Sequence, residues 1–453
     1  MQKTVVIDVV GLSSSVIGEH TPFLKKYISG RHLQTITPML PAVTTAVQST
    51  YITGKTPTEH GIVGNGWYDR EDCEVKFWKQ SNKLVRGEKI WDAAKKLDPK
   101  FTCSKMFWWY NMYSSADYSL TPRPNYLADG RKMPDCYSHP AELRDELQEK
   151  LGQFPLFQFW GPGANIKSTR WIADASMLTD DKYDPTLTLI YLPHLDYCLQ
   201  KFGPDFSKIS QELREVDKVI EDLVTFYEKK KAKIIILSEY GISPVTQPIH
   251  LNRILREKGL LGIRTERGLE LLDAGASQAF AVADHQIAHI YINDFSIKEQ
   301  VRQILESTIG VELILDKKEQ ASYGIDHERS GDFVVMANEA SWFTYYFWLD
   351  DTKAPDYARS VDIHKKPGYD PVEMFMTSKA RAGYKLMRKK FGFRYVMDVI
   401  PLDASLIKGS HGRINTGKEY APVLITQEKH TQTELPATDV YGVIWKHLIG
   451  HNY

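Results

Sequence analysis

Three polar residues near the amino terminus have the types and spacing that phosphoryl chemistry requires. Asp8 lies in an apolar run, TVVIDVV, with the composition of a buried strand. A threonine pair, Thr44 and Thr45, precedes a predicted helix, and Asn65 lies beyond that helix. A carboxylate, a hydroxyl at a helix N-terminus and an amide donor can hold a cation, attack phosphorus and stabilise an oxyanion. The pattern therefore predicts metal-assisted phosphoryl chemistry, although each residue alone could also be a helix cap or a turn residue.

The elements that position these residues follow an alternating pattern. Four short apolar runs are predicted as buried strands, and the segment Ser207 to Lys229 has the apolar periodicity of an amphipathic helix. The predicted strands are Thr4 to Val10, Thr102 to Phe107, Thr186 to Tyr191 and Lys233 to Leu237. Strands that alternate with helices indicate parallel βαβ units, in which ligands bind at the carboxyl ends of the strands.

The character of the chain changes after its first half. Predicted strands at Val282 to Asn293 and Ser330 to Ala337, with a helix at Ser296 to Thr308, indicate a separate unit. We expect a core over residues 1–249, an inserted cap subdomain over 250–345 and the rest of the core over 346–453. In that last part, Tyr395 to Ile400 and Tyr420 to Ile425 are predicted to return to the main sheet.

Composition excludes several classes of protein. The 453 residues contain 57 basic and 57 acidic side chains, so no overall basic field indicates a nucleic acid polymer or a membrane as partner. No apolar run is long enough for a transmembrane helix, and the first residues lack the pattern of a signal peptide. The four cysteines show no CxxC spacing, which argues against a disulfide framework or a cysteine-only zinc site. We expect a cytoplasmic protein.

The segment around the threonine pair resembles a known nucleophile motif. Thr44 precedes Thr53-Gly54 by nine residues, and Pro57, His60-Gly61-Ile62 and Asn65 follow, whereas Thr45 is out of register by one. This is similar to the nucleotide pyrophosphatase/phosphodiesterase (type I phosphodiesterase) family of the alkaline phosphatase superfamily, as a divergent bacterial-type member. The resemblance continues in the family's order at Phe107-Trp108, Leu192 to Pro204, Ile234 to Val245 and Gly409 to Gly412.

The resemblance implies a fold and a metal site. The expected fold is a three-layer α/β/α structure with a mostly parallel central sheet, alkaline phosphatase-like, and an inserted cap. The family's site holds two divalent metal ions; zinc is expected, with manganese or iron as alternatives. The matching ligands are Asp8, Thr44, Asp196, Glu239 and His411.

Two positions depart from the family pattern. Gln200 and Tyr240 stand where the resemblance implies histidines, and each change removes one imidazole. Other side chains could replace these ligands: His194, the pair Asp284-His285, and His364, with His250 and His289 as further histidines of the same region. Each of them could equally be a structural residue.

The resemblance implies a metal-dependent phosphodiesterase or nucleotide pyrophosphatase with Thr44 as nucleophile and Asn65 as oxyanion donor. The candidate substrate-binding residues are Phe107, Trp108 and Tyr240. Phe107 and Trp108 could instead pack in the hydrophobic core. The expected substrate is a small-molecule phosphate ester or nucleotide. The alternatives are a phosphonate or phosphomonoester hydrolase, a phospho-transferase, a catalytically weakened homologue that binds a phosphorylated ligand, or a structural subunit. The sequence leaves the oligomeric state open.

Overall fold

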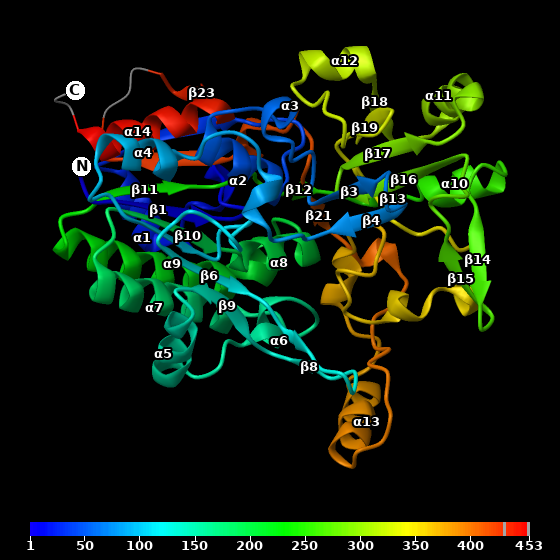
Figure 1. Cartoon of the computed structure of the whole chain (residues 1–453), viewed down its shortest axis with the longest axis horizontal. Helices are drawn as coiled ribbons and strands as arrows, with labels where there is room; N and C mark the ends of the chain where they lie inside the picture. Colours follow the sequence, from blue (N-terminus) through cyan, green and yellow to red (C-terminus); the bar gives the residue numbers. More distant parts are fainter. Residues whose placement is uncertain (429–431, 451–453) are drawn as a thin grey trace.

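A nine-stranded, mostly parallel sheet forms the centre of the molecule (Figure 1). The computed structural model describes residues 1–428 and 432–450. From edge to edge the sheet contains β23 (Glu434–Pro436), β2 (His32–Thr37), β22 (Val423–Thr426), β11 (Lys233–Leu237), β1 (Thr4–Val9), β10 (Leu187–Leu192), β5 (Cys103–Met106), β6 (Tyr118–Pro122) and β9 (Cys136–His139). β22 and β9 run antiparallel to their neighbours, and the remaining neighbours pair in parallel.

Both faces of the sheet are covered by helices, which explains why its strands are apolar throughout. Val5 and Ile7 of β1 point into one hydrophobic cluster, and Val6 points into another on the opposite face. The first cluster includes α1 (Pro22–Ile28), α5 (Glu142–Leu151), α7 (Ile166–Tyr183), α8 (His194–Phe202) and α9 (Phe206–Lys229). The second includes α2 (Thr44–Thr53), α4 (Ile90–Leu97) and α14 (Val440–Ile449). The predicted three-layer α/β/α class is confirmed.

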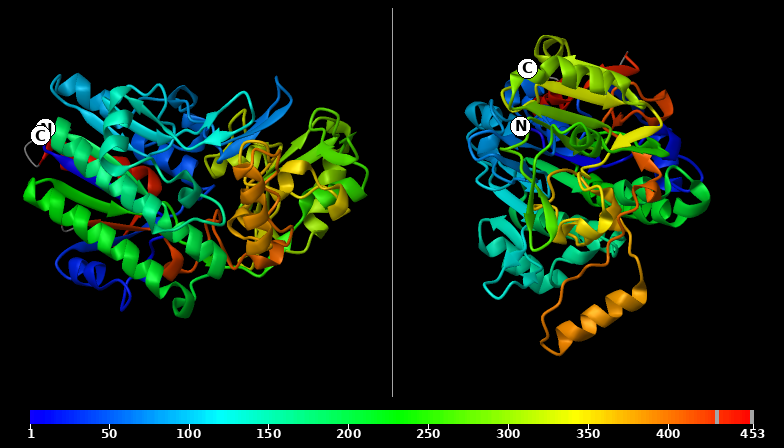
Figure 2. Two further views of the ribbon diagram at one scale, coloured as in Figure 1. Left: turned by 90° about the horizontal axis from the view of Figure 1, so that it is seen from below. Right: turned by 90° about the vertical axis from the view of Figure 1, so that its right-hand side faces the viewer.

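A second, smaller unit lies beside the sheet (Figure 2, left). Its antiparallel sheet has the order β16 (Ala279–Asp284), β17 (Ile287–Ile292), β19 (Phe333–Ala337) and β18 (Val311–Asp316). It carries α10 (Leu251–Glu257), the pair β14 (Ile263–Glu266) and β15 (Leu269–Leu272), α11 (Lys298–Ser307) and α12 (Lys317–Ser322). One hydrophobic cluster joins this unit to residues between Trp342 and Ile407. The division at 249/250 and 345/346 stays a prediction.

Further short elements lie outside these two sheets. They are α3 (Pro57–His60), β3 (Gly66–Asp69), β4 (Glu74–Phe77), β7 (Asn125–Tyr126), β8 (Lys132–Met133), α6 (Leu156–Phe159), β12 (Ser243–Pro244), β13 (Gln247–Ile249), β20 (Ser341–Phe343), α13 (Lys379–Lys390) and β21 (Gly409–Ser410). A buried ion-pair cluster fixes the segment before α13, because Lys366 contacts Asp370 at 2.8 Å and Glu373 at 2.7 Å. α13 itself stands clear of the body (Figure 1).

The structure confirms most of the predicted elements and corrects two. The four core strands and the long helix lie within one residue of their predicted bounds. Val282 to Asn293 is not one strand, because the chain turns at His285 and Gln286 and forms the hairpin β16–β17. Residues 395–400 do not return to the main sheet, whereas the second predicted return forms β22. The sheet also takes up β23, which was not predicted. The strand before His194 ends at Leu192, so His194 begins α8.

Within residues 1–428 and 432–450 no helix has the length and apolarity needed to cross a bilayer. All four cysteines are free thiols, three of them buried. The cytoplasmic location stays a prediction.

Candidate active site

The predicted residues converge where the parallel strands end. Asp8 lies at the carboxyl end of β1 and pairs in register with Tyr191 of β10 and Leu237 of β11. Glu239 follows β11 by two residues, and Asp196 lies in the first turn of α8, which follows β10. Carboxyl ends of parallel strands share one edge of the sheet, so residues distant in the sequence meet there.

A pair of buried carboxylates lies on one side of this site. Asp8 and Glu239 are both almost completely buried, and the amide nitrogen of Gln48 bridges them. Gln48 donates to Asp8 Oδ2 at 3.3 Å and to Glu239 Oε1 at 2.5 Å, while its own carbonyl accepts from the backbone of Trp109 at 2.7 Å. Within residues 1–428 and 432–450, Asp8 Oδ1 and Glu239 Oε2 have no hydrogen-bond partner. One oxygen of each carboxylate is therefore left for another ligand.

Burial makes this pair unusual electrostatically. The pKa of Asp8 lies well above its ordinary value, first because burial disfavours the charge and second because Glu239 repels it. The pKa of Glu239 is also raised by burial. Two carboxylates that resist ionisation together favour the entry of a cation or of a shared proton.

Thr44 begins a hydrogen-bonded chain on the other side of the site. It is the first residue of α2, and its Oγ1 lies 3.0 Å from the Tyr240 hydroxyl. Tyr240 donates its only hydroxyl proton to Asp196 Oδ1 at 3.2 Å, so the Thr44 hydroxyl is the donor in the first bond. Thr44, Tyr240 and Asp196 thus form a directed path for a proton.

Asp196 is held by two further side chains. Gln200 donates to Asp196 Oδ2 at 2.7 Å, and Tyr369 donates to the Gln200 carbonyl at 3.0 Å. Burial raises the pKa of Asp196 to about 7, and the hydrogen bonds from Gln200 and Tyr240 lower it by less. Gln200 therefore acts as an orienting group for the carboxylate.

His411 and His285 lie in a column of four stacked rings. The Tyr240 and His411 rings lie 3.5 Å apart and almost parallel, followed by His285 at 3.8 Å from His411 and Tyr369 at 3.6 Å from His285. Nδ1 of His411 faces the Ala42 carbonyl oxygen at 2.8 Å, and its Nε2 lies 3.8 Å from Asp196 Oδ1 without a hydrogen bond. Burial lowers the pKa of both imidazoles well below the ordinary value, so both are neutral.

Asn65 has a structural arrangement that sequence reasoning did not anticipate. Its side-chain carbonyl accepts from the Thr45 backbone at 3.1 Å, which fixes the first turn of α2. Its backbone and side-chain nitrogens donate to the two oxygens of Asp284 at 2.8 and 3.0 Å, and His285 Nδ1 lies 2.8 Å from Asp284 Oδ1. Asp284 is thereby occupied as an acceptor and, through Asn65, connects the second sheet to the first turn of α2.

Several other candidates lie away from this cluster. His194 is buried without a hydrogen bond, and its ring nitrogen lies 4.0 Å from Glu215. Phe107 packs with Phe154 and Trp171, and Trp108 belongs to the cluster on the opposite face of the sheet. His250 and His289 contact Thr344 and the Val63 carbonyl instead.

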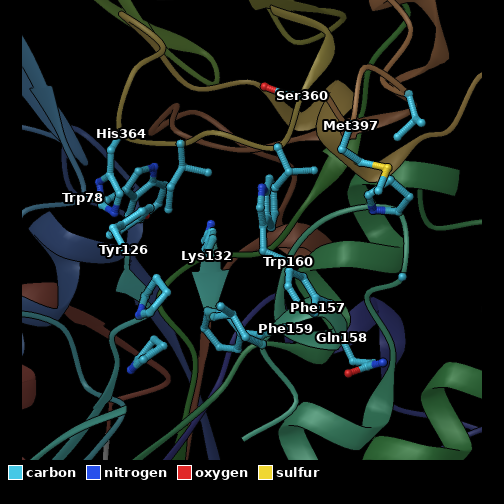
Figure 3. Close-up of a pocket in the computed structure, with 18 of the residues that line it drawn as sticks. Trp78, Tyr126, Lys132, Phe157, Gln158, Phe159, Trp160, Ser360, His364 and Met397 are labelled. Atoms are coloured by element: carbon cyan, nitrogen blue, oxygen red, sulfur yellow. The ribbon is translucent and has the colours of Figure 1, made fainter. Parts of the chain in front are cut away.

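A cavity of about 940 Å³ opens from Thr44 between the two units. Thr44, Asp196, Tyr240 and His285 line its inner end, and His364 lies further out. Figure 3 shows the aromatic wall, in which Trp78 and His364 face Trp160 and Phe159 across the space. Trp78, Trp109, Trp160, Tyr369 and Gln48 are the residues that sequence analysis missed. The neighbouring Phe107-Trp108 pair was the only signal, one residue short of Trp109.

The donors present fit one of the two cations that the resemblance implies. Asp8 and Glu239 each offer a free, buried oxygen next to the helix that begins with Thr44. Asp196 differs, because both of its oxygens already accept hydrogen bonds, and the imidazole of His411 lies beside it at 3.8 Å. Within the described residues no three carboxylate, imidazole or thiol groups converge as a metal site. The set suits a hard cation with oxygen ligands and does not suit a second, imidazole-rich zinc site.

A family model and several known proteins are similar to this chain. A family model described as type I phosphodiesterase / nucleotide pyrophosphatase matches residues 4–370. An uncharacterised pyrophosphatase/phosphodiesterase of Schizosaccharomyces pombe is 27% identical over 225 residues, which are 48% of this chain and 39% of that protein. Ectonucleotide pyrophosphatase/phosphodiesterase 2 of Saccharomyces cerevisiae is 23% identical over 266 residues, 53% of this chain and 48% of that protein. The chain thus spans less than half the length of these relatives.

Solved structures share the fold across the whole chain. Murine ectonucleotide pyrophosphatase/phosphodiesterase 5, an inactive threonine-to-alanine variant in complex with AMP, has a TM-score of 0.59 at 14% identity and covers 99% of this chain and 95% of its own. Phosphonoacetate hydrolase from Sinorhizobium meliloti 1021 in complex with phosphonoacetate has a TM-score of 0.61 at 14% identity, covering 99% and 96%. At this identity the likeness concerns the fold alone.

Proposed function

The chain belongs to the type I phosphodiesterase / nucleotide pyrophosphatase family, and on that premise we propose that it hydrolyses phosphate esters, with Thr44 as the nucleophile. The observation that carries the proposal is the directed hydrogen-bond path from the Thr44 hydroxyl through Tyr240 to Asp196. A hydroxyl that is bonded to a buried base is the usual arrangement of an activated nucleophile. The inactive murine relative, which carries a threonine-to-alanine change, supports a threonine in this role.

The chemistry divides into two steps. The Thr44 oxygen attacks phosphorus in line, its O–P bond forms, and the ester bond to the leaving oxygen breaks. The Thr44 proton passes to Tyr240 while Tyr240 delivers its own proton to Asp196, whose raised pKa lets it accept a proton near neutral pH. Water then attacks the phospho-threonine, a new O–P bond forms, and the O–P bond to Thr44 breaks. The proton on Asp196 returns through Tyr240 to the Thr44 oxygen, the protons of the water pass to the leaving group and to solvent, and a diester substrate is released as its phosphomonoester.

Asp8 and Glu239 are proposed to hold one divalent cation, with Thr44 beside them. Such an ion, when bound, supplies Lewis-acid stabilisation of the negative charge that develops on the reacting oxygens. The oxygen-only donor set favours magnesium or manganese over zinc. Without the ion, Gln48 keeps the two carboxylates apart and oriented through its bridging amide.

The second cation of the expected pair is not part of this proposal. Its donors would be Asp196 and His411, but Gln200 and Tyr240 occupy both carboxylate oxygens. We instead propose that Asp196 works as a proton acceptor and that Tyr240 connects it to Thr44. Asn65 contributes by fixing the helix N-terminus through Thr45, and its remaining amide hydrogen is available to a phosphoryl oxygen.

A phosphodiester fits this site better than a monoester. The cavity extends far beyond the phosphoryl position and its wall is aromatic, so a second esterified group finds contacts there. The phosphonoacetate hydrolase relative makes cleavage of a carbon–phosphorus bond the second candidate. A homologue that binds a phosphorylated ligand without turnover is the third, favoured by the absence of imidazoles at Gln200 and Tyr240.

One assay panel distinguishes these candidates. Purified protein is incubated with manganese or magnesium and with a nitrophenyl phosphodiester, a nitrophenyl phosphomonoester and phosphonoacetate. We expect the diester to be hydrolysed fastest. Preferential release of phosphate from phosphonoacetate would support the second candidate instead. Absence of turnover on all three, with retained binding of inorganic phosphate in calorimetry, would contradict hydrolysis and support the binding homologue.

A further inference from the structure

A buried lysine in the central sheet has no role in the chemistry above. Lys105 is the third residue of β5, and its side chain is completely buried. Its Nζ donates to the Tyr110 backbone carbonyl at 3.1 Å and lies 3.5 Å from the Trp109 carbonyl oxygen and 4.8 Å from the centre of the Trp91 ring. In the part of the chain that the structure describes, no acidic side chain forms an ion pair with it. Lysine is rarely buried completely without such a partner, so this position needs an explanation.

Burial works against the charge of this lysine. It lowers the pKa of the Lys105 amine to about 7, and the opposing effect of Cys103, which raises this pKa, is smaller. An apolar side chain of the same length would fill the space beside Trp91 without this penalty. What its N–H groups hold therefore explains the lysine better than its contribution to the core does.

The carbonyls that Lys105 contacts belong to a strained turn after β5. We call residues 107–111 the Trp109 turn. The φ angles of Phe107 and Tyr110 are 64° and 53°, in the left-handed region of backbone space. Bulky aromatic residues seldom adopt this region, so surrounding contacts must hold them there. Asn82 donates a second hydrogen bond to the Tyr110 carbonyl at 2.9 Å, and together with Lys105 it fixes the turn.

The Trp109 turn connects Lys105 to the buried carboxylate pair. The Trp109 backbone N–H donates to the side-chain carbonyl of Gln48 at 2.7 Å, so the turn determines which end of the Gln48 amide faces it. The amide nitrogen then faces the other way, where it donates to Asp8 and Glu239. An amide carbonyl in its place would meet two carboxylates without a hydrogen to share. The orientation of Gln48 between the candidate cation ligands therefore depends on where the turn holds the Trp109 N–H.

We infer that Lys105 is a positioning residue for the cation site: it holds the Trp109 turn so that Gln48 presents its amide nitrogen to the carboxylate pair. This inference rests on the proposed cation site and adds to it a residue that contacts neither the substrate nor the cation. Groups that orient metal ligands from outside the coordination shell change metal affinity, which makes the role of Lys105 measurable.

Manganese binding tests the connection, with the affinity of the full chain measured by calorimetry. Lys105→Met keeps the length of the side chain and removes the donor, and we expect manganese to bind roughly tenfold more weakly. In a Gln48→Ala background the same change should have no further effect, because Lys105 acts through Gln48. The matched control is Lys89→Met, which removes a lysine that donates to another backbone carbonyl, that of Val85, at 2.7 Å. It should bind manganese as the wild type does.

Hydrogen exchange tests the turn without any metal. In Lys105→Met, peptides that span the Trp109 turn should exchange roughly tenfold faster than in the wild type, whereas peptides of β1 should keep their protection. Asn82→Ala removes the other donor to the Tyr110 carbonyl, so it should change exchange and manganese affinity in the same direction. This second variant decides the question if Lys105→Met does not fold.

The outcomes separate this inference from the proposed function. If the wild type binds manganese and Lys105→Met binds it equally well, faster exchange in the turn would show a purely structural lysine, and the inference would be overturned. A loss of affinity that persists in the Gln48→Ala background would also overturn it, because the effect would not pass through Gln48. If the wild type itself bound no manganese, the proposed cation site would be wrong, whatever the exchange of the turn.

Discussion

The buried carboxylates on the two sides of Thr44 differ in how many of their oxygens accept hydrogen bonds. In the part of the chain that the structure describes, Asp8 and Glu239 each keep one oxygen without a hydrogen-bond partner, whereas both oxygens of Asp196 accept hydrogen bonds. A buried charge without partners is costly, so the first pair favours a cation, while the second group is stable as a proton acceptor. In the proposed function, the two halves of the site therefore have different tasks: Asp8 and Glu239 hold a cation, and Asp196 accepts a proton.

The largest expected effect concerns the residue shared by both sides. Thr44→Ala removes the attacking oxygen and should lower turnover of a nitrophenyl phosphodiester by at least about 10⁴-fold. Thr44→Ser should recover part of the activity, because it keeps the hydroxyl. Thr45→Ser serves as the matched control for the choice within the pair and should stay close to wild type. If Thr45→Ala abolished turnover and Thr44→Ala did not, Thr44 would not be the nucleophile.

The carboxylate pair is tested through Glu239→Gln. We expect turnover to fall about 10³-fold, because the cation loses one of its two charged ligands. The raised pKa values of Asp8 and Glu239 mean that their charges oppose folding at neutral pH, so the variant should be more stable by about 0.5–2 kcal/mol. Manganese should raise the melting temperature of the wild type and not of the variant. Equal shifts in both proteins would show that no cation binds between these carboxylates.

Tyr240→Phe breaks the proton path on the other side of the site. Turnover should fall about 10²-fold. In the wild type, turnover should decline as the pH falls below about 7, because protonated Asp196 can no longer accept the proton. The variant should lose this acid limb, since Thr44 is no longer connected to Asp196. An unchanged pH profile in the variant would exclude the relay.

The smallest effect concerns stability. Because burial raises the folded-state pKa of Asp196 to about 7, its contribution to stability is complete at low pH and is lost as the pH rises through that value. Asp196→Asn removes the titrating group, so the wild type should lose more stability than the variant between pH 5 and about 8, by roughly 1–3 kcal/mol. Urea unfolding at the two pH values measures this difference. Parallel losses in both proteins would contradict the assignment.

Local sequence signals predicted the core of the fold well. The strands β1 and β11 are continuous apolar runs that are covered on both faces, and α9 has a long amphipathic pattern, so the hydrophobic pattern alone was sufficient. The hairpin at His285 was missed because its two strands are equally apolar and no glycine or proline marks the turn. Residues 395–400 were assigned to the sheet for the same reason, since apolar composition does not say which surface covers a segment.

The sequence by itself determined the residue types of the site, the αβ alternation and the order in which strand ends deliver Asp8, Asp196, Glu239 and His411. Only the tertiary structure decided that Gln48 bridges two carboxylates, that Tyr240 connects Thr44 to Asp196, and that Trp109 rather than Trp108 faces the cavity. Spacing along the chain fixes which residues can reach one edge of a sheet, but hydrogen-bond partners depend on side-chain directions. Those directions are set by packing between segments that lie far apart in the sequence.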